Sequence, residues 1–148
     1  MKWLLDTNVV SESARERPNQ LIIEWLKAKP GEELAISVVT LAELRDGASS
    51  IRDVARREKL TGWIESSVVP TFQGRTLALS SEVLVDWLRL ARRLRAKGIA
   101  RDPSDMLIAA TARVAELTLV TRNTRHFANT GVVLYDPWTG RTHAMDAP

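Results

Sequence analysis

The stretch LLDTNVVSE (residues 4–12) places one carboxylate, Asp6, between two apolar runs near the start of the chain. Residues 2–5, which are mostly apolar, are typical of a short buried strand. An aspartate directly after a strand commonly caps the turn that follows. Asp6 becomes a candidate for chemistry only if carboxylates from elsewhere in the chain are brought to the same place.

Length and composition limit the classes of protein to consider. The chain has 148 residues, of which 45% are hydrophobic, enough for one domain with a full core. It has no cysteine, which excludes disulfides, thiolate zinc sites and a cysteine nucleophile. No apolar run approaches the roughly 20 residues that span a bilayer, and a charge at position 6 interrupts any signal-peptide core. A soluble, cytoplasmic protein is therefore expected.

Strands and helices are predicted to alternate along the chain. Short apolar runs predict strands over residues 2–5, 34–37, 75–80, 118–121 and 132–135. Helical spacing predicts helices over residues 19–29, 39–50, 52–66, 81–97 and 103–117. Short strands separated by helices indicate an α/β domain with a parallel sheet, covering residues 1–138. The tail, residues 139–148, shows no periodicity and is expected to be irregular.

Four polar side chains follow predicted strands closely. Asp6 ends the first strand, and Asn123 follows the fourth directly. Glu43 lies in the first turns of the helix after the second strand, and Asp105 lies in the first turn of the helix that begins at Pro103. Sites in open parallel sheets form beyond the carboxyl ends of the strands. If the first and fourth strands are neighbours, all four side chains could face one pocket.

Each acid also has an ordinary structural explanation. Asp6 can cap a turn, Glu43 can be a solvated helix residue, and Asp105 can complement the helix dipole. Yet all three acids are embedded in apolar segments, where an unpaired charge is costly to bury. Clustered acids would repel one another unless a cation neutralised them. A hard divalent ion with oxygen ligands, Mg²⁺ or Mn²⁺, fits such a cluster best.

Four segments occur along the chain in the order LLDTNVVSE, SVVTLAELRDG, DPSDMLIAATA and LVTRNTRHF. Together they resemble the PIN-domain proteins, and most of all the VapC-type ribonuclease toxins of the FitB-like branch. The segment YDPW is similar to the ending of that branch, so the resemblance covers residues 1–138. It implies a three-layer α/β/α sandwich with a central parallel sheet of about five short strands, usually in a homodimer.

The resemblance also implies a function. Asp6, Glu43 and Asp105 match the family's three acids, which hold Mg²⁺ or Mn²⁺, directly or through water, for hydrolysis of RNA phosphodiesters. Asp6 and Asp105 would hold the ion, and Glu43 would orient the attacking water or accept its proton. The chain would then be the toxin of a type II toxin–antitoxin pair, inhibited by a VapB-like antitoxin whose C-terminal segment occupies the active site.

This chain departs from the family at His126, where an aspartate is usual. Asn123 carries no charge, so the expected pocket has three acids rather than four. One tightly held ion is therefore expected, with a second binding weakly or only with substrate. His126 either contacts a phosphate, accepts a proton or simply packs beside Phe127 at the rim. Thr7 is expected to shape the loop after the first strand together with Asn8. Thr7, Arg122 and His126 are expected at the substrate-binding rim of the site. Arg122 and Arg125 are each a phosphate contact, a surface charge or the partner of a carboxylate.

A basic stretch, residues 89–101, carries six Lys or Arg and no acid, in a chain whose overall net charge is only +3. It could meet a polyanion or an acidic protein, or it could be the solvated face of an amphipathic helix. The aromatic residues are scattered, so RNA recognition by shape and phosphate position is expected rather than base stacking.

Two other functions remain open, and a third is poorly supported. One is a PIN-fold binding or regulatory module with weak or lost nuclease activity. A haloacid-dehalogenase-like phosphatase would need an acid at position 8, where this chain has Asn8. A DNA-binding helix-turn-helix would need a partner helix and turn before the basic helix, and neither is recognisable.

Overall fold

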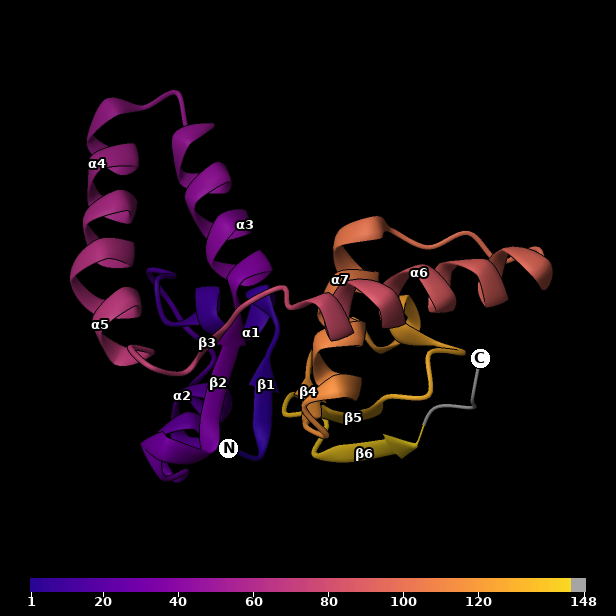
Figure 1. Ribbon diagram of the computed structural model, residues 1–148. Helices are drawn as coiled ribbons and strands as arrows, with labels where there is room; N and C mark the ends of the chain where they lie inside the picture. Colours follow the sequence, from indigo (N-terminus) through magenta and orange to yellow (C-terminus); the bar gives the residue numbers. More distant parts are fainter. Residues whose placement is uncertain (145–148) are drawn as a thin grey trace.

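A six-stranded sheet forms the centre of the computed structural model, which describes residues 1–144 (Figure 1). Its strands are β1 (Trp3–Leu5), β2 (Leu34–Ser37), β3 (Thr76–Leu77), β4 (Thr118–Val120), β5 (Val133–Asp136) and β6 (Arg141–Ala144). Their order is β3-β2-β1-β4-β5-β6. All neighbours are parallel except β5 and β6, which are antiparallel. Strand β1 is thus paired with β4, the arrangement needed to bring Asp6 and Asn123 to one edge.

The helices are α1 (Thr7–Glu12), α2 (Gln20–Lys27), α3 (Val38–Ser49), α4 (Val54–Trp63), α5 (Val69–Thr71), α6 (Ser81–Ala96) and α7 (Pro103–Val114). Short 3₁₀ turns lie at η1 (Gly31–Glu33) and η3 (Thr124–Phe127), and η2 (Ile64–Val68) is a π-helical stretch between α4 and α5. No helix within residues 1–144 is both long and apolar enough to cross a bilayer.

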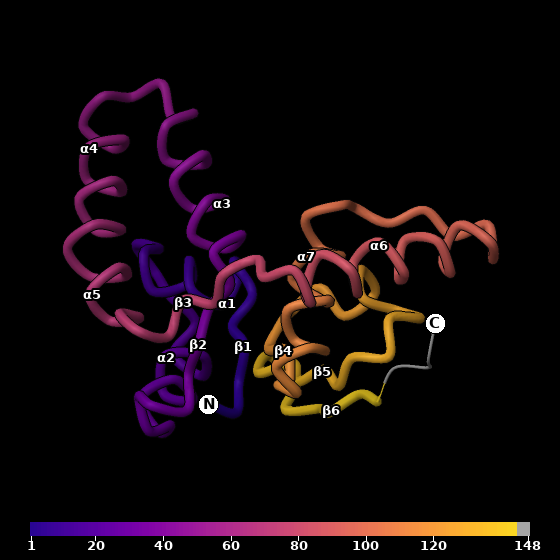
Figure 2. The backbone as a smooth tube through the Cα atoms, in the orientation of Figure 1, coloured from indigo at the N-terminus to yellow at the C-terminus, as the bar shows by residue number. Residues whose placement is uncertain are grey.

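Both faces of the sheet are buried, because successive side chains of a strand point to opposite faces. Leu4 packs into a core with residues of α6 and α7, whereas Leu5 packs into a second core with residues of α1, α2 and α3. Figure 2 shows the same division along the chain: the first half covers one side, and the chain then crosses over to α6 and α7. The expected three-layer α/β/α sandwich is confirmed.

The third strand is shorter than predicted, Thr76–Leu77, and the helix predicted over residues 52–66 ends at Trp63 and continues as η2. Two larger differences from the sequence predictions lie at α1 and at the C-terminal tail. Helix α1 begins directly at Thr7, where only a loop was expected after the first strand. The tail was expected to be irregular from residue 139, but Arg141–Ala144 forms strand β6 beside β5. A turn returns the chain there: the Asp136 carboxylate accepts a bond from the Trp138 backbone N–H at 2.8 Å, and Gly140 adopts a φ of 71°. Residues 145–148 lie outside the described part of the chain.

Candidate active site

A cavity of about 670 Å³ opens at the carboxyl ends of β1 and β4. Its lining includes all four side chains that the sequence placed beyond strand ends: Asp6, Glu43, Asp105 and Asn123. Thr7 and His126 also line it, as expected of rim residues. The geometry therefore gathers residues from β1, α3, α7 and the segment after β4, which lie far apart in the sequence.

Asp6 is fixed more firmly than the other two acids. It is 5% exposed, and its Oδ1 accepts a bond from the Thr7 backbone N–H at 2.8 Å, so it does cap α1. Its Oδ2 accepts bonds from Thr121 Oγ1 at 2.7 Å and from Asn8 Nδ2 at 3.2 Å. Burial raises the pKa of Asp6 above its ordinary value, although these hydrogen bonds and the nearby His126 lower it. Capping and a functional role therefore coexist in this residue.

Glu43 enters the cavity from α3, whose first turn is capped by the Ser37 hydroxyl accepting from the Val39 backbone N–H at 3.1 Å. The Glu43 side chain is half-buried, and its Oε1 accepts a bond from the Thr7 hydroxyl at 3.2 Å. Burial raises the pKa of Glu43, and repulsion by Asp6, Asp105 and other nearby carboxylates raises it further. Glu43 is therefore electrostatically coupled to the other acids and is no isolated solvated residue.

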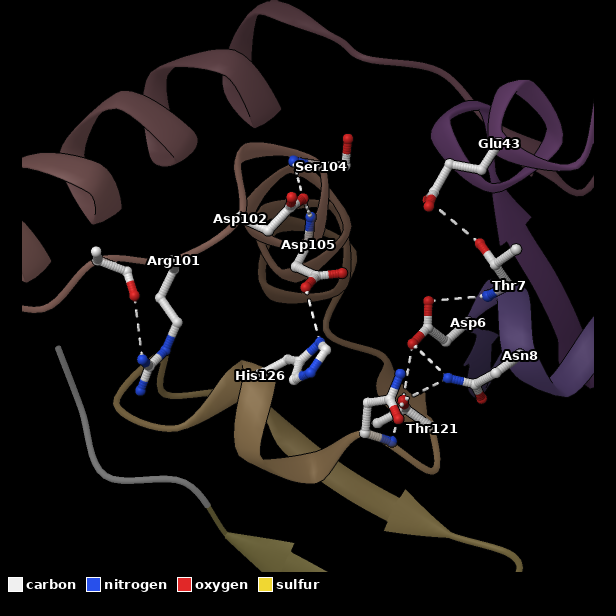
Figure 3. Close-up of polar contacts among 12 residues, drawn as sticks. Asp6, Thr7, Asn8, Glu43, Arg101, Asp102, Ser104, Asp105, Thr121 and His126 are labelled. Atoms are coloured by element: carbon white, nitrogen blue, oxygen red, sulfur yellow. Dashed lines mark hydrogen bonds and ion pairs between the residues drawn. The ribbon is translucent and has the colours of Figure 1, made fainter. Parts of the chain in front are cut away.

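Asp105 lies one turn into α7, which is capped by Asp102. The Asp102 Oδ1 accepts bonds from the backbone N–H of Ser104 at 2.9 Å and of Asp105 at 3.2 Å. The Asp105 side chain itself turns to His126, with Oδ2 at 3.1 Å from the Nδ1 of the imidazole (Figure 3). Burial raises the pKa of Asp105, as do the charges of Asp6 and Asp102, and His126 opposes them.

His126 does not simply pack beside Phe127, which was one of its expected roles. Phe127 is fully buried in the core, whereas the side chain of His126 is 56% exposed and faces Asp105. In this position the imidazole can hydrogen-bond to Asp105, whereas an aspartate would have added a further acid to the cavity. Asn123 is exposed at the cavity edge, and its backbone N–H donates to Thr121 Oγ1 at 3.0 Å.

The side chain of Arg122, which was expected at the site rim, packs against Trp138 instead. Its guanidinium lies over the Trp138 ring, 5.3 Å from the centroid, and the residue is not part of the cavity lining. A cation over an indole face is favourable, and Trp138 is brought there by the turn after β5. Only the Arg122 backbone serves the site, since its N–H donates to Asn8 Oδ1 at 3.2 Å. Arg125, by contrast, does line the cavity.

Thr121 was missed by the sequence analysis as a site residue. It is fully buried at the end of β4 and donates its hydroxyl proton to Asp6. The same oxygen accepts bonds from Asn8 Nδ2 at 3.3 Å and from the backbone N–H of Asn123. Thr121 thus ties the ends of β1 and β4 together around the Asp6 carboxylate. The available signal was a hydroxyl residue at the end of a buried strand.

The acids fit a partly hydrated divalent cation better than a closed protein cage. Within residues 1–144, no three His, Cys, Asp or Glu side chains converge closely enough to form a metal site by themselves. Mg²⁺ commonly binds proteins through only one or two carboxylates and keeps several waters. Asp6 and Asp105 can supply two such oxygen donors, with Glu43 reaching the ion through water. Burial is the main reason why the pKa values of these acids are raised, and repulsion between carboxylates, which a bound cation would offset, adds to it at Glu43 and Asp105.

Known proteins share both the sequence pattern and the fold. The family model described as PIN domain matches residues 3–133. Toxin FitB of Neisseria gonorrhoeae is 34% identical over 135 residues, which are 91% of this chain and 97% of FitB. The VapC ribonuclease Y4jK of Sinorhizobium fredii is 31% identical over 135 residues, 91% of this chain and 96% of the relative. The crystal structure of FitAcB from N. gonorrhoeae superposes with a TM-score of 0.86 at 34% identity, covering 92% of this chain and 98% of that one.

Proposed function

This chain belongs to the PIN-domain family, with FitB- and VapC-type toxins among its relatives, and on that premise we propose that it is a divalent-metal-dependent endoribonuclease. We assign it as the toxin of a type II toxin–antitoxin pair that acts on cytoplasmic RNA. The observation that carries the assignment is the convergence of Asp6, Glu43 and Asp105 on one cavity. Gathering the buried Asp6 with the half-buried Glu43 and Asp105 is unfavourable for a protein that only has to fold, so the arrangement favours a catalytic role over a binding module without activity.

Asp6 and Asp105 are the proposed direct ligands of the ion. A bound Mg²⁺ or Mn²⁺ would neutralise charge on the phosphodiester and lower the pKa of a bound water. The hydrogen bonds that Thr7, Asn8 and Thr121 donate to Asp6 hold its carboxylate in one orientation before substrate arrives. Such preorganisation reduces the cost of assembling the site.

Glu43 is the proposed acceptor of the proton from the attacking water. Its raised pKa brings the carboxylate closer to the pH at which a general base works efficiently. The Thr7 hydroxyl, which donates to Oε1, leaves Oε2 for the water. Arg125 and His126, on the cavity wall, can contact phosphate oxygens of the RNA.

A small antitoxin is the proposed inhibitor. Its arginine-bearing segment would enter the same cavity, because a guanidinium can pair with the carboxylates that otherwise repel one another. Co-expression of a neighbouring gene that encodes a small DNA-binding protein is expected to restore growth of cells that express the chain. If no adjacent gene product suppresses toxicity or binds the protein, a paired antitoxin is contradicted.

We also propose a homodimer. Val85 of α6 is 44% exposed and Val114 of α7 is 41% exposed, and the two line one shallow recess with a polar and charged rim of Ser81, Glu82, Asp86 and Arg89. Apolar side chains gathered on a surface favour burial against another copy. Light scattering should give a mass twice that of the single chain, which is 16.5 kDa, and Val85→Glu should shift the measured mass toward that of one chain. A wild-type protein that stays monomeric at micromolar concentration would contradict this assignment.

Incubation of the purified protein with total cellular RNA, followed by end mapping, tests the enzymatic proposal. Site-specific cuts are expected with Mg²⁺ and none with a chelator. Glu43→Gln should lower the rate by about 10²–10⁴-fold. Asp46→Asn is the matched control, because Asp46 is an exposed acid of the same helix outside the cavity lining. RNA binding without any cleavage would instead favour the binding module.

A further inference from the structure

A second recess lies directly beside the acid cavity. It measures about 570 Å³ and is bounded by α6 and by the chain that leads from Gly98 into the first turn of α7. Ala100 and Arg101 line both spaces, so the recess and the cavity adjoin. Nothing in the proposed chemistry uses this recess.

The recess has an apolar lining and a basic edge. Trp87, Leu88 and Ala91 line it from α6, and Ile99 and Met106 line it from the other side. Trp87 packs partly against the core, whereas Leu88 is 57% exposed. Arg95 and Arg101 are the charged residues of the lining, and both belong to the basic stretch, residues 89–101, which contains no acid. The surroundings therefore suit a flat apolar group attached to an anion.

Arg101 has unused hydrogen-bonding capacity at the junction of the two spaces. Within residues 1–144, its Nε is buried and has no hydrogen-bond partner. Its Nη1 donates to the Ala100 carbonyl at 3.2 Å and its Nη2 to the Ala128 carbonyl at 3.4 Å, both long bonds. Figure 3 shows the side chain between the start of α7 and the segment that carries His126. A guanidinium held this way is suited to bind a phosphate.

We propose that the recess is a nucleobase subsite: it holds the base of a nucleotide next to the cleaved bond, while Arg101 binds that nucleotide's phosphate. The inference rests on the proposed ribonuclease function and extends it to substrate selection. Single-stranded RNA presents an exposed base beside a phosphate, and an unstacked base gains from packing against aromatic and apolar side chains. The arginines at the edge and the lack of acids favour this polyanion over an apolar side chain of a protein partner.

Steady-state cleavage of a single-stranded RNA that contains a mapped cut site tests the subsite. Leu88→Glu places a carboxylate at the recess and should raise KM about tenfold with little change in kcat. Leu21→Glu is the matched control: Leu21 is 61% exposed and lies on α2, which is remote from α6 (Figure 1), and it lines neither space. Arg101→Gln should raise KM by a similar factor, whereas Arg56→Gln, on exposed α4, should not. Equal KM values for Leu88→Glu and Leu21→Glu would overturn the proposal.

An abasic scan of the same RNA identifies the nucleotide. One abasic position beside the cut bond should raise KM in the wild type, and this penalty should vanish in Leu88→Glu, because the base no longer has its recess. A penalty that is the same size in both proteins would contradict the assignment. A merely structural effect of Leu88→Glu would not remove the dependence on one base.

Direct binding separates this inference from the enzymatic proposal. If the wild type cuts no RNA with any divalent metal, the enzymatic proposal fails. Fluorescence anisotropy with the same oligonucleotide then still supports the subsite if Leu88→Glu weakens binding about tenfold relative to Leu21→Glu. If neither variant alters RNA binding but Leu88→Glu releases the cognate antitoxin, the recess belongs to a protein partner and the proposal is overturned.

Discussion

Replacing Thr121 by valine tests how the Asp6 carboxylate is held. The side chains have nearly the same shape, so the change removes the hydroxyl and little else. Asp6 then loses the 2.7 Å bond to its Oδ2, and the side chain of Asn8 and the backbone N–H of Asn123 lose an acceptor. Because Thr121 is fully buried, water cannot easily replace the missing group.

The loss of stability expected for Thr121→Val follows from the charge and the burial of Asp6, which accepts the hydrogen bond from Thr121. A hydrogen bond to a charged group contributes about 1.5–3 kcal/mol, and leaving a buried acceptor unsatisfied falls in the same range. We expect Thr121→Val to lower the free energy of unfolding by about 2–3 kcal/mol, a fall in Tm of roughly 5–10 °C for a domain of this size. The Thr121 hydrogen bond is also the strongest of the influences that lower the pKa of Asp6. Its loss should raise that pKa further.

Two measurements on the same variants separate these effects. Urea denaturation gives the change in stability, and the pH profile of kcat/KM for RNA cleavage gives the change at Asp6. The acid limb should move to higher pH in Thr121→Val, because Asp6 would stay protonated over a wider range. Thr121→Ser, which keeps the hydroxyl, should retain the wild-type profile. A valine variant with wild-type stability and an unmoved acid limb would refute the reasoning.

Three further predictions address the charges of the site and the frame around it. Asp105→Asn should abolish cleavage yet raise the free energy of unfolding of the metal-free protein by about 0.5–1 kcal/mol. The gain is modest because the Asp105 carboxylate is partly solvated. Urea denaturation that shows a loss of stability above about 1 kcal/mol would contradict this prediction. Folding raises the pKa of Asp105, so the stability difference between Asp105→Asn and the wild type should depend on pH. It should shrink as the pH falls through the folded pKa toward the unfolded value near 3.8, where the wild-type carboxyl is also neutral. A stability difference that is independent of pH would contradict a raised pKa at Asp105. Arg113→Ala should lower the free energy of unfolding by about 2–3 kcal/mol, because Arg113 Nε pairs with Asp86 at 2.8 Å and its Nη1 donates to the Thr130 carbonyl at 2.6 Å. A change below about 0.5 kcal/mol in urea denaturation would show that these contacts contribute little.

The parts of the site that the sequence predicted depend on chain direction alone. Residues that follow parallel strands come together at one edge of the sheet once β1 and β4 are neighbours, and this placed Asp6 and Asn123 correctly. Glu43 and Asp105 were found because each lies in the first two turns of a helix that leaves the same edge. The direction of a strand and the start of a helix are both visible in the apolar pattern.

The parts that could not be predicted depend on side-chain direction and packing. Thr121 reaches Asp6 only because β4 lies in one register against β1, with Leu5 opposite Val120. Arg122 turns to Trp138, a contact made by a turn that follows a different strand. Trp87 is one of several scattered aromatic residues in the sequence, and only the fold sets it beside the acid cavity. Spacing along a single segment carries none of this information.

Two local errors have simpler causes. Helix α1 has only 6 residues, too short to show a helical repeat, and it follows β1 without an intervening loop. Strand β6 consists of Arg141–Ala144, which lack an apolar alternation because the strand lies at the edge of the sheet. Its pairing with β5 is set by the turn between them rather than by burial.

Crystals of the protein soaked in Mn²⁺ offer the most direct measurement of whether distant carboxylates share one ion. The account predicts a single strong anomalous peak in the cavity, about 2.0–2.4 Å from carboxylate oxygens of Asp6 and Asp105, and its loss in Asp6→Asn. Two fully occupied, protein-held peaks without substrate would contradict the expectation of one tightly held ion. A cavity that stays free of manganese at millimolar concentration would contradict the shared cation itself.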